Sequence, residues 1–384
     1  MNNKELITEI RKNPMYGYLL LLVIAMATGF QGWRTLFNNY GVDVVGINGF
    51  QVGAIQSVRE IPGFLALLVV YLLLVFREHK LGALSILVMG IGVSATGIFP
   101  SFAGLIFTTL LMSTGFHYFE TVNQSLTLQY FNKQEAPVVI GRIKSFGALT
   151  NIIVGGIIWI TSQYLELHLL FIIFGAIVML IGVFALTRNP VNKSLPKQQK
   201  KMVLKKKYWL FYVLNFLGGA RRQIFVVFAV FMLVEKYEFE VKGIALLFII
   251  NNIVTYFAAP LIAKGINRFG ERTILSIEYI FLIAIFLCYA FIENRNVVTV
   301  LYVMDHIFFS AAMAINTFFQ KTGAQQDIAP SMAVGFTINH ISAVVIPIVG
   351  GALWMLNWRI PFIAGAGIAV LSLFFAQKIR IPTQ

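Results

Sequence analysis

Cysteine and charged residues are both scarce in this chain. One cysteine, Cys288, occurs among 384 residues, so no intrachain disulfide can form and a thiolate metal site is not expected. Only 12% of the residues are charged, whereas soluble domains carry about 25%. The 16 acidic residues are outnumbered by 30 basic ones, which gives a net charge of +14. This composition excludes a disulfide scaffold and is not that of an ordinary soluble domain.

Hydrophobic residues, 58% of the chain, are gathered in long apolar runs such as "YLLLLVIAMATGF" and "ILSIEYIFLIAIFLCYAFI". With their neighbours these runs reach the roughly 20 residues that a helix needs to span a membrane. The first run follows a polar stretch without a small-residue cleavage pattern, so we expect a retained helix and not a signal peptide. The sequence therefore predicts an all-α membrane protein with twelve transmembrane helices. They are expected near residues 16–40, 50–76, 81–99, 101–130, 141–162, 167–187, 208–234, 243–264, 273–292, 297–320, 332–356 and 360–377.

Basic residues predict the orientation of these helices. Loops rich in Lys and Arg alternate with poorer loops, and the positive-inside rule assigns the rich set to the cytoplasm. Both termini are then cytoplasmic, and the lack of long loops favours a bacterial inner-membrane protein. The basic excess is a topology signal next to anionic lipid headgroups, so nucleic-acid binding is not expected. We expect a monomer that carries no cofactor and no metal.

The longest polar interruption lies in the middle of the chain. It reads "RNPVNKSLPKQQKKMVLKKK", residues 188–207, and we interpret it as a cytoplasmic basic linker. It separates residues 1–187 from residues 208–384, and each part holds six expected helices. A Gly-Gly pair recurs in the fifth helix, at Gly155, and in the eleventh, at Gly350, which indicates an internal repeat. Such a pair allows the backbone of a neighbouring helix to approach closely.

The loop between the eighth and ninth helices reads "AKGINRFGER", Ala263 to Arg272. It resembles the G-x-x-x-D-R-x-G-x-R loop of the major facilitator superfamily, because Arg268, Gly270 and Arg272 match while Ala263 and Asn267 replace the first Gly and the Asp. The resemblance implies two pseudo-symmetric six-helix bundles around a central substrate cavity. It also implies that Arg268, Gly270 and Arg272 belong to a gating loop that governs switching between states.

Polar side chains at membrane depth supply the candidate substrate site. Gln31, Arg34 and Asn38 recur at steps of three and four residues, so we expect them to share one helix face. A guanidinium suits the oxygens of carboxylate, phosphate or sulfonate groups, and a surplus of deep arginines over deep acids therefore indicates an anionic substrate. The predicted substrate-binding residues are Gln31, Trp33, Arg34, Arg59, Arg221, Arg222, Asn252 and His340.

Several of these residues also have a structural interpretation. Adjacent residues such as Arg221 and Arg222 point about 100° apart on a helix, so we expect one to contact substrate and the other to hold a helix. The sequence does not decide which is which. Arg34 with Glu60, or Arg59 with a carboxylate, can form a structural ion pair that holds the first and second helices together, and His340 can be a hydrogen-bonded packing residue. Glu278, near a helix start, is expected at the membrane interface.

Acidic residues at depth supply the candidate proton sites. Burial raises the pKa of a carboxylate and a nearby Arg lowers it, so a carboxylate whose Arg partner comes and goes can load and release a proton. The predicted proton-coupling residues are Glu60, His117, Glu120 and Asp305.

The predicted function is secondary active transport of a small organic, anionic solute by alternating access, coupled to protons. Two alternatives remain open. One is a proton-driven efflux antiporter for amphipathic, drug-like or siderophore-like compounds, because the expected interior is rich in Phe and Met. The other is a metal-ion transporter or a non-transporting membrane protein, although "HYFE" at His117 to Glu120 is a single pair of possible ligands. An enzyme is not expected, because no extramembrane loop exceeds about twenty residues.

Overall fold

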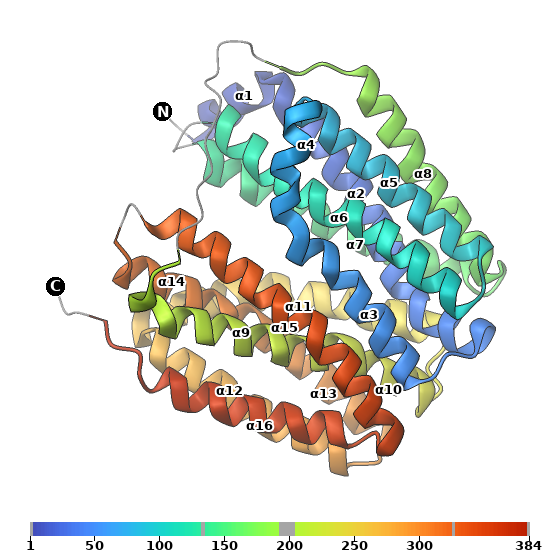
Figure 1. The fold of residues 1–384 in the computed structure, drawn as a ribbon, viewed down its shortest axis with the longest axis vertical. Coiled ribbons are helices and arrows are strands. Elements are labelled where there is room, and N and C mark those ends of the chain that lie inside the picture. The colour runs from blue at the N-terminus through green and yellow to red at the C-terminus, as the bar shows by residue number, and fades with distance from the viewer. Residues whose placement is uncertain (1–2, 132–134, 192–203, 325–326, 382–384) are drawn as a thin grey trace. The chain divides into compact units, whose positions relative to one another are not determined.

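The computed structural model describes residues 3–131, 135–191, 204–324 and 327–381. Within these ranges the regular structure is entirely helical, and contacts between helices divide it into two compact units (Figure 1). Nine helical stretches are long and apolar enough to cross a membrane, and Val241–Thr255 and Ile360–Ala376 are shorter apolar helices. An interrupted helix within Gly49–Val75 completes the twelve expected spans. The predicted all-α membrane fold is therefore confirmed.

Unit 1 comprises the described parts of residues 1–45, 61–199 and 241–249. Helix α5 packs along α8 and α6, and α2 packs against α7 and α8. Buried side chains such as Leu22, Ile86, Phe119 and Val178 form the core between these helices. The helices that lie wholly in this unit are α1 (Asn3–Lys12), α2 (Pro14–Asn39), α4 (Val69–Val75), α5 (Glu78–Ile98), α6 (Phe102–Tyr130), α7 (Glu135–Thr161) and α8 (Leu167–Thr187).

Unit 2 comprises the described parts of residues 46–60, 200–240 and 250–384. In this unit α9 packs along α15 and α16, and α16 packs along α12. Its helices are α9 (Trp209–Gln223), α10 (Val230–Glu235), α12 (Glu271–Phe291), α13 (Arg295–Phe308), α14 (Met313–Thr322), α15 (Ile328–Leu356) and α16 (Ile360–Ala376). Two further helices, α3 (Gly49–Phe64) and α11 (Val241–Phe269), contribute residues to both units. The predicted division at residues 188–207 stays a prediction, and residues 192–203 of this linker lie outside the described ranges.

Three of the expected transmembrane helices are not regular along their length, and in the tenth a 3₁₀ turn, Phe309–Ala312, separates α13 from α14. Pro62 lies inside α3, and a 3₁₀ turn, Leu65–Leu68, separates α3 from α4. Because Pro62 has no N–H, the hydrogen bond to the carbonyl of Val58 is missing, which weakens α3 in the turn before this break. The seventh span changes from α9 into a π-helical turn, Ile224–Ala229, directly after Arg221 to Gln223. Single π turns inside helices are frequent at functional sites, so Arg221 and Arg222 are candidate functional residues.

Each Gly-Gly pair packs against a helix that comes from the other half of the sequence. In unit 2, Gly351 of α15 lies against Phe50 and Gly53 of α3, and a Cβ atom on Gly53 would clash with the carbonyl of Pro347. In unit 1, a Cβ atom on Gly155 of α7 would lie 3.0 Å from the side chain of Ile249. Close backbone approach was the expected role of these pairs, and the contact of Gly351 with α3 confirms it.

Replacing a tightly packed glycine by alanine is expected to destabilise unit 1. A Cβ atom on Gly90 would lie 2.7 Å from the backbone nitrogen of Met179 in α8, whereas a Cβ atom on Gly156 would meet nothing within 4 Å. Overpacking typically costs about 1–3 kcal/mol. Gly90→Ala should therefore lower the thermal midpoint of the detergent-solubilised protein, measured by tryptophan fluorescence. Gly156→Ala, the same change in another helix, is the control, and equal midpoints for the two variants would contradict the packing argument.

Candidate functional site

Arg221 forms a buried ion pair within unit 2. Its Nη2 donates to Glu278 Oε1 at 2.6 Å, and the two residues are only 6% and 2% exposed. The guanidinium carbon lies 4.6 Å from the centre of the Tyr279 ring, and Nη1 makes a longer contact of 3.4 Å with the Ser372 hydroxyl of α16. Arg221 therefore connects α9 with α12 and α16. Arg222, the next residue, is half-buried.

This geometry corrects two expectations from the sequence. Glu278 lies about two turns after the first residue of α12, Glu271, so it is deeper in its helix than expected, and it is one of the most buried acids of the described chain. Glu60, Glu278 and Asp305 are buried, whereas only Arg59 and Arg221 of the four arginines predicted at depth are, so the predicted arginine surplus is wrong. The prediction of an anionic substrate therefore depends on the surroundings of individual arginines and not on the number of arginines.

A second buried ion pair lies on α3, in the part that belongs to unit 2. The Glu60 carboxylate contacts the guanidinium of the adjacent Arg59 through Oε1 and lies 2.9 Å from His340 Nδ1 of α15 through Oε2. Arg59 Nε donates to Gln56 Oε1 at 2.7 Å, one turn earlier in α3. The His340 ring packs edge-on against Phe336, with 4.4 Å between ring centres. Arg59, Glu60 and His340, predicted separately from the sequence, form one cluster.

The polar face of α2 lies in unit 1. Arg34 Nε donates to Gln31 Oε1 at 2.7 Å, and Gln31 Nε2 donates to Thr35 Oγ1 at 3.0 Å, so the predicted shared face is confirmed for these residues. The Arg34 guanidinium also lies 4.9 Å from the ring centre of Phe248. Trp33 is 2% exposed and stacks on Phe37 with 4.5 Å between ring centres, so its ring belongs to the core of unit 1.

The other predicted site residues differ in their burial. His117 is buried on α6 beside the Phe116 ring, whereas Glu120 on the same helix is exposed. Asp305 is buried on α13, and Asn252 is half-buried on α11. His117 and Glu120 belong to unit 1 and the other two to unit 2. Their proposed roles stay predictions.

The loop between α11 and α12 has the turn that its glycine predicts. Gly270 has a φ of +81°, a conformation that favours glycine, and it separates the two helices. Arg272 Nε donates to Gln377 Oε1 at 3.0 Å, and Arg268 is exposed. Glu271, which the sequence did not single out, is buried and lies 2.6 Å from Lys321 Nζ at the end of α14. The gating role of Arg268, Gly270 and Arg272 is not tested by this geometry.

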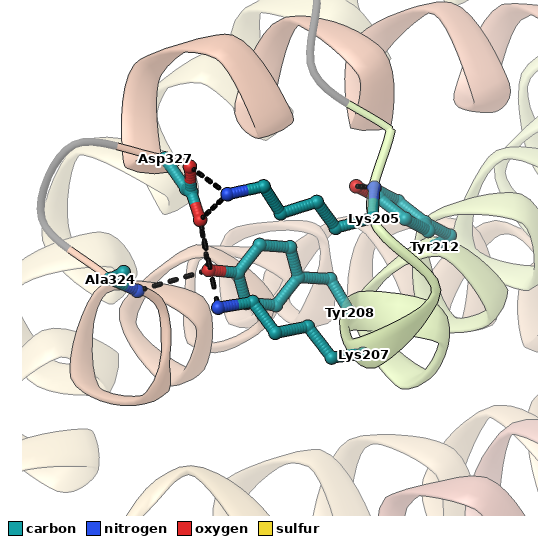
Figure 2. Close-up of polar contacts among 6 residues, drawn as sticks. All are labelled: Lys205, Lys207, Tyr208, Tyr212, Ala324 and Asp327. Atoms are coloured by element: carbon teal, nitrogen blue, oxygen red, sulfur yellow. Dashed lines mark hydrogen bonds and ion pairs between the residues drawn. The ribbon is translucent and has the colours of Figure 1, made fainter.

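A further polar cluster surrounds Asp327, directly before α15 (Figure 2). Both carboxylate oxygens lie 2.8 Å from Lys205 Nζ, and Oδ2 also accepts from the Tyr208 hydroxyl at 2.6 Å. Lys207 Nζ lies 3.7 Å from the same oxygen, and the Tyr208 oxygen accepts from the Ala324 N–H. Hydrogen bonds from Lys205 and Tyr208 hold the pKa of Asp327 below its usual range. The end of the predicted linker is thus fixed to the start of α15, a contact that the sequence analysis missed.

Comparison with known proteins identifies one family and several similar folds. The family model described as Major Facilitator Superfamily matches residues 15–326. The crystal structure of the nucleoside transporter NupG has 19% sequence identity and a TM-score of 0.76, over 95% of this chain and 98% of that chain. An inward-facing, unoccupied bacterial homologue of the human lysosomal transporter Spinster has 13% identity and a TM-score of 0.73, over 96% and 99%. No curated protein matches the chain in sequence. At these identities the similar structures show the fold alone.

Neutralising Asp327 is expected to destabilise the protein in a pH-dependent manner. Because the folded-state pKa lies below the ordinary value of 3.8, ionised Asp327 contributes stability fully above that value and loses it as the pH falls through the folded-state pKa. Asp327→Asn should lower the thermal midpoint at pH 7, and the difference from wild type should shrink below pH 3.8. The control is Asp43→Asn, the same change at an exposed residue. A midpoint unchanged by Asp327→Asn at pH 7 would contradict a stabilising role for the cluster.

Proposed function

The chain belongs to the Major Facilitator Superfamily, and from this premise we propose that it is a proton-coupled secondary transporter of a small organic anion. The family and the transporters of similar fold support secondary transport in general and indicate a transporter and not an enzyme. We propose further that it acts by alternating access, as a monomer in lipid of a bacterial inner membrane. Both termini are then cytoplasmic.

The surroundings of Glu60 carry the proposal of proton coupling. One carboxylate oxygen meets the permanent cation of Arg59, which favours the ionised form, and the other meets an imidazole that can share or accept a proton. Because His340 lies on α15 and Glu60 on α3, the protonation of this cluster is linked to the contact between two helices from different halves of the sequence. His117, Glu120 and Asp305 complete the proposed proton-coupling residues.

The surroundings of Arg34 support an anionic substrate. Two neutral side chains, Gln31 and Phe248, contact its guanidinium and help to fix its orientation. Phe30 and Phe116 stack with 4.5 Å between ring centres, and the Phe30 ring centre is 5.8 Å from the guanidinium carbon. This combination of charge and aromatic surface suits an organic body with an anionic group. Gln31, Trp33, Arg59, Arg222, Asn252 and His340 remain proposed substrate contacts, whereas the pairing of Arg221 with Glu278 favours a helix-holding role.

A proton-driven efflux antiporter for amphipathic compounds is the second candidate. Phe225, in the π-helical turn of the seventh span, stacks on Tyr302 with 5.0 Å between ring centres and lies 5.9 Å from the His306 ring. An aromatic surface of this kind suits a planar apolar group. Uncharged nucleosides also belong among the test compounds, because a nucleoside transporter shares the fold. The charge of the compound that binds best distinguishes an anion transporter from an efflux antiporter for amphipathic compounds and from a transporter of uncharged nucleosides.

Arg34→Gln is expected to weaken binding of the preferred anion roughly tenfold to a hundredfold, because a hydrogen bond to a charged group contributes about 1.5–3 kcal/mol. The measurement is thermal stabilisation of the purified protein by small carboxylates, organophosphates, nucleosides and amphipathic cations. Arg295→Gln, at an exposed arginine, is the matched control and should leave the affinity unchanged. Stabilisation of wild type by nucleosides or amphipathic cations but not by any anion would show that the anionic assignment is wrong.

Glu60→Gln is expected to abolish gradient-driven accumulation while retaining exchange. The amide cannot load or release a proton, but it keeps the volume of the carboxyl group in the cluster with Arg59 and His340. In proteoliposomes with an imposed pH gradient, net uptake of the best-binding compound should fall to the level without a gradient, whereas counterflow should persist. Glu240→Gln, at an exposed glutamate, should behave like wild type. Accumulation that still follows the pH gradient in Glu60→Gln would exclude Glu60 as the coupling residue.

A further inference from the structure

One end of unit 2 carries positive charge that no described acid balances. At this end α16 finishes beside the first residues of α9 and α12 (Figure 1). Its exposed basic side chains are Arg272, Lys378 and Arg380, and no carboxylate of the described residues lies within ion-pair distance of them. Glu271 is buried against Lys321, and Asp327 is buried against Lys205 and Lys207. The acids at this end are therefore already paired, and the surplus charge is available to an anionic ligand.

Neutral neighbours hold two of these cations in place. Lys378 Nζ lies 4.6 Å from the centre of the Phe374 ring and 5.6 Å from the centre of the Trp209 ring. Arg272 Nε donates to Oε1 of Gln377, the residue directly before Lys378, at 3.0 Å. This bond uses only the Nε of Arg272, so both Nη groups can donate to a ligand. A guanidinium and an ammonium group on neighbouring helices suit the oxygens of a phosphate group.

An exposed apolar stripe leads away from these cations along α16. Leu371 and Phe374 precede Lys378 by two turns and one turn, so the three side chains share one face, and Phe374 is 57% exposed. A Cβ atom on Gly367, one turn before Leu371, would meet nothing within 4 Å, so the stripe stays open there. Trp209, 46% exposed, lies beside Lys378, and tryptophan is enriched where a membrane meets water. A phospholipid, which has a phosphate group and acyl chains, fits both the charge and the stripe.

The opposite end of unit 2 has a different charge balance. Lys236 also lies over a tryptophan there, 4.4 Å from the ring centre of Trp358. The adjacent Glu235 supplies a negative charge, however, and Arg359 pairs with Glu293. A lysine over a tryptophan ring therefore occurs at both ends of the unit, whereas the surplus of positive charge occurs at one. Lys236 is thus a matched control for Lys378.

We propose that Trp209, Arg272 and Lys378 form a binding site for one anionic phospholipid, with its phosphate group between the two cations and an acyl chain along Leu371 and Phe374. The bound lipid contacts the ends of α9, α12 and α16 together, so it stabilises the contacts among these helices. This site goes beyond the proposed transport function and does not depend on it, because the lipid is a bound partner of the protein and not the transported solute.

The test is thermal unfolding of the purified, full-length protein in a neutral detergent, followed by tryptophan fluorescence, as phosphatidylglycerol or phosphatidylcholine is added to the micelles. Phosphatidylglycerol should raise the midpoint saturably and at a lower mole fraction than phosphatidylcholine with the same acyl chains. Lys378→Gln and Arg272→Gln should each raise its half-saturating mole fraction about fivefold, because each loses one cation at the headgroup. Lys236→Gln should leave that value unchanged. Equal titrations with the two lipids, or a shift in Lys236→Gln as large as in Lys378→Gln, would overturn the proposal.

A second comparison separates a lipid from a soluble anion. Inorganic phosphate at matched ionic strength should give no stabilisation that Lys378→Gln removes. Leu371→Ser should weaken binding of phosphatidylglycerol, because it interrupts the apolar stripe while keeping both cations. Stabilisation by phosphate that depends on Lys378, or an unchanged lipid titration in Leu371→Ser, would show that the lipid assignment is wrong. If one of the two cation variants cannot be purified in folded form, the other decides the test, since both side chains are exposed.

Discussion

The energetic cost of a charge inside a membrane constrains this structure more than any other single factor. An arginine at the centre of a transmembrane helix costs about 2.5–3.5 kcal/mol on insertion scales unless it faces a partner. Arg221 meets Glu278 of α12, and Arg59 meets Glu60, which also meets His340 of α15. Each pair determines which helices must touch, so the polar residues select the partners while apolar packing supplies the close fit of their surfaces.

Features that depend on neighbours along the chain could be predicted from the sequence. Helical spans follow from the length of apolar runs. The bonds from Arg34 to Gln31 and from Gln31 to Thr35 follow from the helical repeat. The positive φ of Gly270 agrees with the turn that the family resemblance implies. In each case the residues that decide the structure lie within a few positions of one another.

Features that depend on distant partners could not be predicted. Arg221 and Glu278 are 57 residues apart and Lys205 and Asp327 are 122 apart, and no local pattern says which acid meets which base. Glu278 lies deeper in its helix than the sequence predicts, because α12 begins at Glu271, about two turns before it. Once Glu278 is counted, the buried acids of this set outnumber the buried arginines, and the number of arginines no longer supports an anionic substrate.

The two buried ion pairs of unit 2 hold helices together through charges that need one another. Arg221 and Glu278 join α9 to α12, and the carboxylate of Glu60, which pairs with Arg59 on α3, contacts His340 of α15. Removing the charge of one partner would leave the other as an uncompensated buried charge, at a cost of about 3–5 kcal/mol. Since each cluster joins different helices, such a loss of charge would favour separation of those helices.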